Sequence, residues 1–201
     1  MAYREVVTCV AAGPVLGFAD MGIEIRRAAV SDTAELHDVA ARTFALACPP
    51  ETTQADVDEF VAAHLSVARF EEYLKDDLRV LLIAESDGEP VGYAMLVSGP
   101  IADEDVRRVV EQDGSVELSK FYVLQDRHGS GIARELMAAT LEAAAATGAT
   151  LCWLGVNQLN ARAARFYEKN GFTVRGTKHF RVGAQWHDDH VRARPLGHGP
   201  H

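Results

Sequence analysis

Cysteine, basic charge and long apolar runs are all scarce in this sequence, and each scarcity excludes a class of protein. The 201 residues include three cysteines, Cys9, Cys48 and Cys152, and no CxxC pair. The cysteines are odd in number and widely spaced, and without a CxxC pair a structural zinc site is not indicated, so a reducing, cytoplasmic compartment is expected. The net charge of −9 argues against nucleic-acid binding, which depends on clustered Lys and Arg. No window reaches the roughly 18 consecutive apolar residues of a membrane span, so no membrane is expected as a partner.

The two ends of the chain differ in pattern from the rest. Residues 6–19 (VVTCVAAGPVLGFA) are apolar and follow the basic residue Arg4, as in a signal peptide. Glu5 and the Gly13-Pro14 pair argue against that interpretation. We therefore expect 1–20 to be a loosely attached extension, 21–196 to form one domain, and 197–201 to be a flexible tail.

Helical and strand patterns alternate along the chain. Apolar alternation and short apolar runs predict strands at 23–28, 79–86, 90–98, 115–124, 150–156, 172–177 and about 185–194. Helical spacing predicts helices at 33–47, 55–77 with a break near 64–66, 102–112, 131–147 and 160–170. Helices that alternate with strands, with hairpins in the middle and at the end, indicate an α/β fold in which helices cover one mixed sheet.

A glycine-bearing loop between a strand and a helix is the first candidate site. The run ELSKFYVLQDRHGSGIARELMAA (117–139) ends a strand at Leu124 and begins a helix near Gly131. A helix start leaves N–H groups without partners and carries about half a positive charge, and small residues let a phosphate approach it. Neither the dinucleotide pattern GxGxxG nor the P-loop pattern is met. From this loop alone, a pyrophosphate site and a tight turn without a ligand are equally good interpretations.

A later helix carries a second pattern. Asn160 stands at its N-cap position, and Gly171 follows its last turn. One face, at i, i+3, i+4 spacing, carries Ala163, Phe166, Tyr167 and Asn170. Considered alone, Tyr167 is more simply explained as a core aromatic than as a catalytic residue.

Taken together, the two segments resemble the GNAT family of acyl-CoA-dependent N-acetyltransferases. The family's pyrophosphate signature falls on His128, Gly131 and Ala133, and His128 departs from the family's preference for Arg or Gln. The later family pattern, Asn followed by Ala and FYxxxGF, is met by Asn160, Ala164, Phe166, Tyr167, Gly171 and Phe172. The resemblance runs from Ile23 to about Pro195. It implies a mostly antiparallel sheet with a splay between its fourth and fifth strands, and helices on both faces.

A narrower resemblance concerns one subgroup of the family. WLGVNQLNARAARFYEKNGF and GTKHFRVGAQWHDDHV look like segments of bacterial PaiA-type polyamine (spermine/spermidine) acetyltransferases. Because this likeness concerns backbone segments more than substrate contacts, it says little about which amine is used. We favour a small-molecule primary amine or polyamine as acceptor, and a protein amino group is the alternative. A non-catalytic acyl-CoA-binding regulator on the same fold is the alternative from a different class. Homodimers are common in the family, and the oligomeric state stays open.

The GNAT resemblance also implies acetyl-CoA as the acyl donor and assigns roles to residues. The pantetheine arm would pair with the main chain of Phe121, Tyr122 and Val123. The remaining cofactor-binding residues would be His128, Gly129, Ser130, Gly131, Ile132, Ala133, Arg134 and Asn160. Glu117 would be the general base for the amine, and Tyr167 would protonate the CoA thiolate. From the residue alone, Glu117 is equally a solvent-facing carboxylate or one that holds the ammonium by charge.

Two acidic segments suggest further sites. The run HDDH at 187–190 has metal-ligand side chains, but neighbours on a strand face opposite ways, so the four cannot converge on one ion. No metal is therefore expected, although one of these acids could line the substrate end of the site. The acid-rich helical region contains Asp56, Asp58, Glu59, Glu71, Glu72, Asp76 and Asp77. Its plain interpretation is a solvated surface, and its alternative is an acidic rim that favours polyamines.

Overall fold

A single mixed sheet organises the part of the chain that the structure describes. The computed structural model describes residues 22–48, 52–110, 113–124, 131–182 and 185–197, so the expectations for 1–20 and most of 197–201 lie outside it. Seven strands are ordered β1-β2-β3-β4-β5-β7-β6. All neighbours are antiparallel except β4 and β5, which are parallel. The predicted mixed, mostly antiparallel sheet is confirmed.

The strands begin close to their predicted positions. Their bounds are Ile23–Arg27 (β1), Arg79–Ser86 (β2), Glu89–Val97 (β3), Ser115–Val123 (β4), Leu151–Asn157 (β5), Thr173–Val182 (β6) and Gln185–Pro195 (β7). The strand predicted at 172–177 continues to Val182, because β6 pairs with β7 along almost its whole length. Pairing with a neighbouring strand therefore extends β6 through Lys178 and His179, which have no strand signal of their own.

The helices also follow the predicted spacing, with one exception. Their bounds are Thr33–Ala47 (α1), Gln54–His64 (α2), Val67–Lys75 (α3), Glu104–Arg107 (α4), Ile132–Ala146 (α5) and Ala161–Lys169 (α6), and a 3-10 turn, Val30–Asp32, precedes α1. The break predicted near 64–66 is confirmed, because Ser66 accepts a hydrogen bond from the Arg69 N–H and begins α3. The helix predicted over 102–112 is wrong in length, since α4 is a single turn. β-branched valines at 109 and 110 follow it, and such residues propagate helices poorly.

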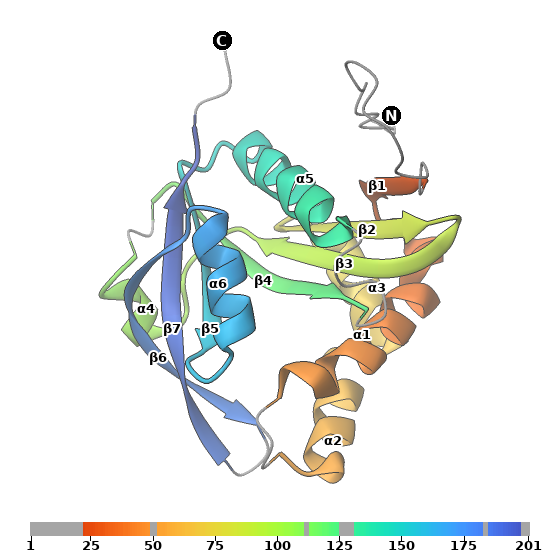
Figure 1. The fold of residues 1–201 in the computed structure, drawn as a ribbon, viewed down its shortest axis with the longest axis horizontal. Helices are drawn as coiled ribbons and strands as arrows, with labels where there is room; N and C mark the ends of the chain where they lie inside the picture. Colours follow the sequence, from red (N-terminus) through yellow and green to blue (C-terminus); the bar gives the residue numbers. More distant parts are fainter. Residues whose placement is uncertain (1–21, 49–51, 111–112, 125–130, 183–184, 198–201) are drawn as a thin grey trace.

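Helices lie on both faces of the sheet (Figure 1). α5 packs against β1 to β4, while α1 and α3 pack together against β2 to β4. In Figure 1, α5 lies in front of these strands and α3 behind them. A second, smaller core under α4 consists of Ile101, Val106, Val110, Trp153, Val191 and Ala193. Trp153 is only 4% exposed there, as expected for a core residue.

The parallel pair β4–β5 stays together over only part of its length. The paired positions are Ser115 with Leu151, Val116 with Cys152, and Glu117 with Trp153. β4 continues to Val123 and β5 to Asn157, yet no pairing joins these later residues. The predicted splay between the fourth and fifth strands is therefore confirmed, and it begins after Glu117.

Candidate active site

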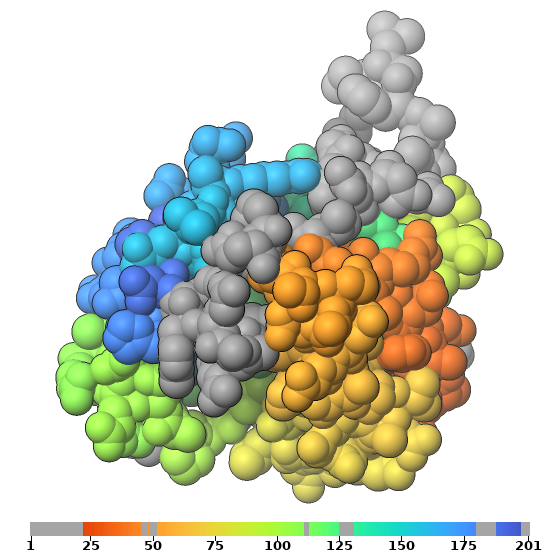
Figure 2. All heavy atoms as spheres, turned by 90° about the horizontal axis from the view of Figure 1, so that it is seen from below, coloured from red at the N-terminus to blue at the C-terminus, as the bar shows by residue number. Residues whose placement is uncertain are grey.

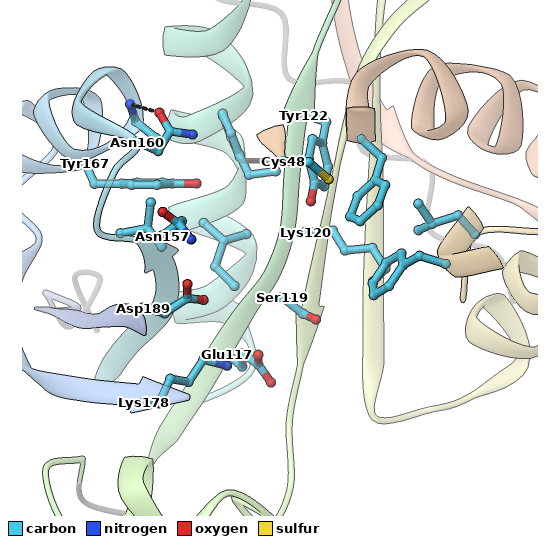
Figure 3. A pocket seen from close by; sticks show the side chains of 18 residues that line it. Cys48, Glu117, Ser119, Lys120, Tyr122, Asn157, Asn160, Tyr167, Lys178 and Asp189 are labelled. Carbon is cyan, nitrogen blue, oxygen red and sulfur yellow. Dashed lines mark hydrogen bonds between the residues drawn. The ribbon is translucent and has the colours of Figure 1, made fainter. Parts of the chain in front are cut away.

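A pocket of about 290 Å³ lies where β4 and β5 separate. Its lining comes from six elements and the end of α1: Phe44, Cys48, Phe60, Leu65, Glu117, Leu118, Ser119, Lys120, Phe121, Tyr122, Gly155, Val156, Asn157, Asn160, Ala163, Tyr167, Lys178 and Asp189. Figure 3 shows Tyr167, Asn157 and Asp189 on one side, facing Tyr122 and Lys120 on the other. Helices α2 and α6 lie far apart in the sequence, but atoms of both are exposed on the face of the molecule shown in Figure 2.

β4 contributes an irregular backbone to this pocket. Met95 and Leu96 are consecutive on β3, but they pair with Lys120 and Leu118, so Ser119 is an extra residue on β4. A bulge of this kind bends a strand and redirects its side chains. Of the three predicted main-chain sites, Phe121 and Tyr122 line the pocket, whereas the Val123 side chain is buried in the core.

Glu117 lies at the point where the strands begin to separate. It pairs with Trp153 at the last parallel position, and its side chain faces the pocket. Burial raises the pKa of its carboxyl, while the positive charges of Lys178, Lys120 and Arg79 work against that rise. A carboxylate with a raised pKa is a stronger base than one in water, so Glu117 is suited to accept a proton.

Tyr167 reaches the pocket from α6. Aromatic rings surround it, with centroids 6.4 Å away at Phe121, 5.6 Å at Phe166 and 5.8 Å at Phe172. Burial raises the pKa of its phenol well above the ordinary value, and the nearby Tyr122 adds to this. Tyr167 therefore holds its proton at neutral pH, as a proton donor must.

Asn160 both caps helix α6 and lines the pocket. Its side-chain oxygen accepts a hydrogen bond of 3.0 Å from the Ala163 N–H, which confirms the predicted N-cap of α6. The residue also lines the pocket, so its amide group faces the open ends of β4 and β5.

The start of α5 is the predicted diphosphate site. Gly131 has φ +90°, and among the described residues no non-neighbouring atom lies within 4 Å of the place where a Cβ would stand. Ile132 and Ala133 occupy the first turn, where helical N–H groups have no carbonyl partners. The Ile132 side chain is buried in the core, so this residue offers only its main chain, and Arg134 pairs with Glu135. His128, Gly129 and Ser130 lie outside the described residues.

The sequence prediction did not include Lys120, Lys178 or Asn157 among the site residues. Lys178 and Asp189 are opposite each other in the β6–β7 register. Gly155 makes room for them, because a Cβ there would lie 2.5 Å from Lys178 Cε and 3.3 Å from Asp189 Oδ2. Lys178 lies beyond the strand predicted at 172–177. Asp189 was predicted only as one of the acids at 187–190, any of which could line the substrate end of the site.

Lys120 projects from β4 into the other side of the pocket (Figure 3). Its ammonium nitrogen lies 5.7 Å from the centre of the Tyr73 ring. Burial lowers the pKa of Lys120 to about 8, Glu117 opposes this change, and Arg79 adds to it. The sequence places Lys120 inside the run 117–139, but strand alternation cannot show which side a residue faces beside a bulge.

The acidic segments do not gather at this pocket as a group. Of the acids at 187–190, Asp189 lines the pocket, while Asp188 lies 2.9 Å from His179 Nδ1. Among the described residues, no group of three or more His, Cys, Asp or Glu side chains is arranged to hold a metal ion. None of the seven acids between 56 and 77 lines the pocket. Glu71, Glu72 and Asp76 instead pair with Lys75, Arg69 and Arg79.

Comparison with known proteins agrees with this geometry. The sequence profile described as the acetyltransferase (GNAT) family matches residues 42–172. The chain belongs to the GNAT family. An uncharacterized N-acetyltransferase of Mycobacterium tuberculosis is 49% identical over 167 residues, which are 83% of this chain and 99% of that protein. Family membership and this relative identify the chain as an N-acetyltransferase.

Solved structures show the same fold for this GNAT chain. The PaiA N-acetyltransferase of Thermoplasma acidophilum, solved with coenzyme A, has a TM-score of 0.69 at 20% identity, covering 87% of this chain and 99% of that one. The ribosomal-protein-S18-alanine N-acetyltransferase of Escherichia coli has a TM-score of 0.62 at 16% identity, covering 89% and 96%. At these identities the likeness shows the fold and leaves the acceptor undecided.

No helix among the described residues is long and apolar enough to cross a membrane.

Proposed function

We propose that the chain transfers an acetyl group from acetyl-CoA to a primary amine. The observation that carries this proposal is the pocket at the separating ends of β4 and β5, with Glu117 and Tyr167 both facing it. A base and a proton donor are what the two halves of this reaction require, and both groups have pKa values suited to those tasks.

The residues present suit coenzyme A. The open length of β4 offers a strand edge where an amide-rich pantetheine arm can add as a further strand would. The first turn of α5, with the open space at Gly131, suits a diphosphate. Residues Phe121 to Val123, the segment 128–134 and Asn160 are therefore the proposed cofactor-binding residues.

The chemistry follows from the acceptor's charge. An alkylammonium has a pKa of about 10.4, so its proton must be removed before the nitrogen can attack. Glu117 accepts that proton, directly or through a water. The amine nitrogen then forms a bond to the thioester carbonyl carbon, and the carbon–sulfur bond breaks. Tyr167 gives its proton to the departing thiolate. The nitrogen then returns its second surplus proton to the Tyr167 oxygen, directly or through a water, so the products are the neutral amide and coenzyme A as a thiol.

The acceptor we favour is a small molecule. A pocket of about 290 Å³ matches the lower end of small-molecule sites. The sequence segments that resemble polyamine acetyltransferases are compatible with an amine of low molecular weight. A protein amino group is the second candidate, because the Escherichia coli neighbour with this fold is named for acetylating a ribosomal protein.

Release of free thiol during incubation with acetyl-CoA and a panel of amines tests the proposal. An N-acetyltransferase of small amines releases thiol in proportion to amine consumed, with the acetylated product visible by mass spectrometry. A non-catalytic acyl-CoA-binding regulator would be stabilised thermally by coenzyme A but would release none. Stabilisation by NAD or ATP instead of coenzyme A would contradict the proposed cofactor. We also propose a reducing, cytoplasmic setting, which is consistent with the free thiols of Cys48 and Cys152.

A further inference from the structure

Lys120 differs from the other cations near the pocket in its lack of a carboxylate partner. Arg79 pairs with Asp76 at 2.9 Å, and Lys178 lies opposite Asp189 in the sheet. Among the described residues, no carboxylate forms an ion pair with Lys120, and its Nζ lies 5.7 Å from the centre of the Tyr73 ring. Lys120 is partly buried, and the charge of Glu117 acts on it without forming an ion pair, so a ligand that places an anion beside Lys120 would be bound favourably.

The charges around Glu117 also bear on the acceptor. Lys178, Lys120 and Arg79 all act on this carboxylate, and they work against its raised pKa. A polyamine would bring additional positive charge next to these three cations, and it would be repelled. An amine with a negative group elsewhere in the molecule would instead be attracted by Lys120 while its nitrogen approaches Glu117.

We propose that the acceptor is a primary amine that also carries an anionic group, in the simplest case a carboxylate, and that Lys120 binds this group. The inference rests on the proposed function, since it concerns the acceptor end of the same pocket. It replaces the polyamine with an amino-carboxylate. Glu117 and Lys120 stand on the same strand on either side of the Ser119 bulge and line the same pocket, so one small molecule can reach both.

A length-matched set of amines tests the charge preference. For each chain length, the set contains an alkylamine, the α,ω-diamine, the ω-amino carboxylate and the aminoalkylphosphonate. Acetylation of each amine is measured by the release of free thiol. We expect the kcat/KM of the amino-carboxylate to exceed that of the alkylamine by about 10- to 100-fold, the range of a hydrogen bond to a charged group. A higher value for the phosphonate would still support an anionic acceptor and would identify the anion as phosphate-like.

Variants of Lys120 test whether this residue is responsible. Lys120→Met should abolish the preference for the carboxylate over the alkylamine, and Lys120→Glu should shift it toward the diamine. Lys75→Met is the matched control, because Lys75 is exposed, pairs with Glu71 and does not line the pocket. The control should keep the wild-type preference. Circular dichroism and melting temperature check that the two Lys120 variants are folded.

The outcomes separate the two proposals. If the diamine is the best acceptor, or if Lys120→Met lowers the kcat/KM of every amine by the same factor, the anionic acceptor is wrong while the acetyl transfer stands. If no amine in any set causes thiol release, the proposed function itself is wrong.

Discussion

The two halves of the β4–β5 pair differ although they belong to the same strands. In the paired half, Val116 and Cys152 are 1% and 0% exposed, and the backbones are joined as parallel neighbours. In the open half, β4 and β5 instead present polar side chains, including Lys120 and Asn157, to a pocket. The paired residues of β4 and β5 therefore hold the two parts of the sheet together, and we propose that the unpaired residues bind ligands.

Backbone chemistry explains why the open half is suited to binding a ligand. A strand edge that no neighbour covers leaves N–H and C=O groups to be satisfied by water or by a bound molecule. The side chains at the boundary, Glu117 above all, are thereby placed beside whatever occupies the edge.

Replacing the boundary carboxylate should have the largest effect. Glu117→Gln keeps the size of the side chain and removes the base, so we expect kcat/KM at neutral pH to fall by about 10² to 10⁴. The deficit should shrink at high pH, where more of the amine is already deprotonated. Glu72→Gln, an exposed change outside the pocket, is the control. A variant that loses less than threefold would assign Glu117 a different role.

The pH dependence of kcat/KM in the wild-type protein should reflect the titration of the Glu117 carboxyl. Because the pKa of Glu117 is raised above the ordinary value of 4.5, the carboxyl is protonated, and inactive as a base, below that raised value. Activity should therefore increase as the pH rises through it, and kcat/KM measured from acidic to neutral pH reports the position. An acidic limb that persists unchanged in Glu117→Gln would belong to another group.

Tyr167→Phe should have the next largest effect. Phenylalanine keeps the ring contacts with Phe121, Phe166 and Phe172 and removes only the hydroxyl. Since a thiolate is already a fair leaving group, kcat should fall by about 10- to 100-fold, at the lower end for acid catalysis, with little change in the KM for acetyl-CoA. Tyr93→Phe is the control, because the buried Tyr93 hydroxyl has no hydrogen-bond partner among the described residues. Equal losses in both variants would contradict a catalytic Tyr167.

The sequence predicted the features of the fold that arise from local pattern. The turn at Ser66, the cap at Asn160 and the positive φ of Gly171 all depend on residues close in the chain. Strand β6 was predicted too short, because its second half depends on pairing with β7. The length of α4 was overestimated for a similar reason: its valines were assigned to a helix, whereas they fill the second core.

The site was predictable in part. Glu117, Tyr167 and Asn160 were identified from motifs, and the structure brings all three to one pocket. Lys120 and Lys178 were missed because no motif marks them: one follows a bulge, and the other lies on the unpredicted part of β6. Side-chain direction at such positions is set by tertiary pairing, which strand periodicity does not contain.

A pair of glycines at the two ends of α5 tests the diphosphate site. Gly131 and Gly148 have φ of +90° and +84°, and in the part of the chain that the structure describes neither would place a Cβ within 4 Å of a non-neighbouring atom. Alanine at either position should lower the free energy of unfolding by about 1 kcal/mol through its backbone conformation alone. Only Gly131→Ala should also weaken coenzyme A binding, several-fold by calorimetry. Equal affinities in the two variants would place the diphosphate elsewhere.

Substitutions of Asn160 should have the smallest effect on activity. Two variants distinguish its role as the N-cap of α6 from its proposed role in cofactor binding. Asn160→Ala removes the oxygen that accepts from the Ala163 N–H and should cost about 1 kcal/mol of stability. Asn160→Asp keeps that oxygen and the cap, but it replaces the amide donor that faces the pocket. If Asn160 binds the cofactor, coenzyme A affinity should fall in both variants while the melting temperature falls only in Asn160→Ala. If Asn160→Asp binds coenzyme A with wild-type affinity, Asn160 acts only as a helix cap. Tyr167 would then be the one residue of the proposed site that comes from the α6 segment.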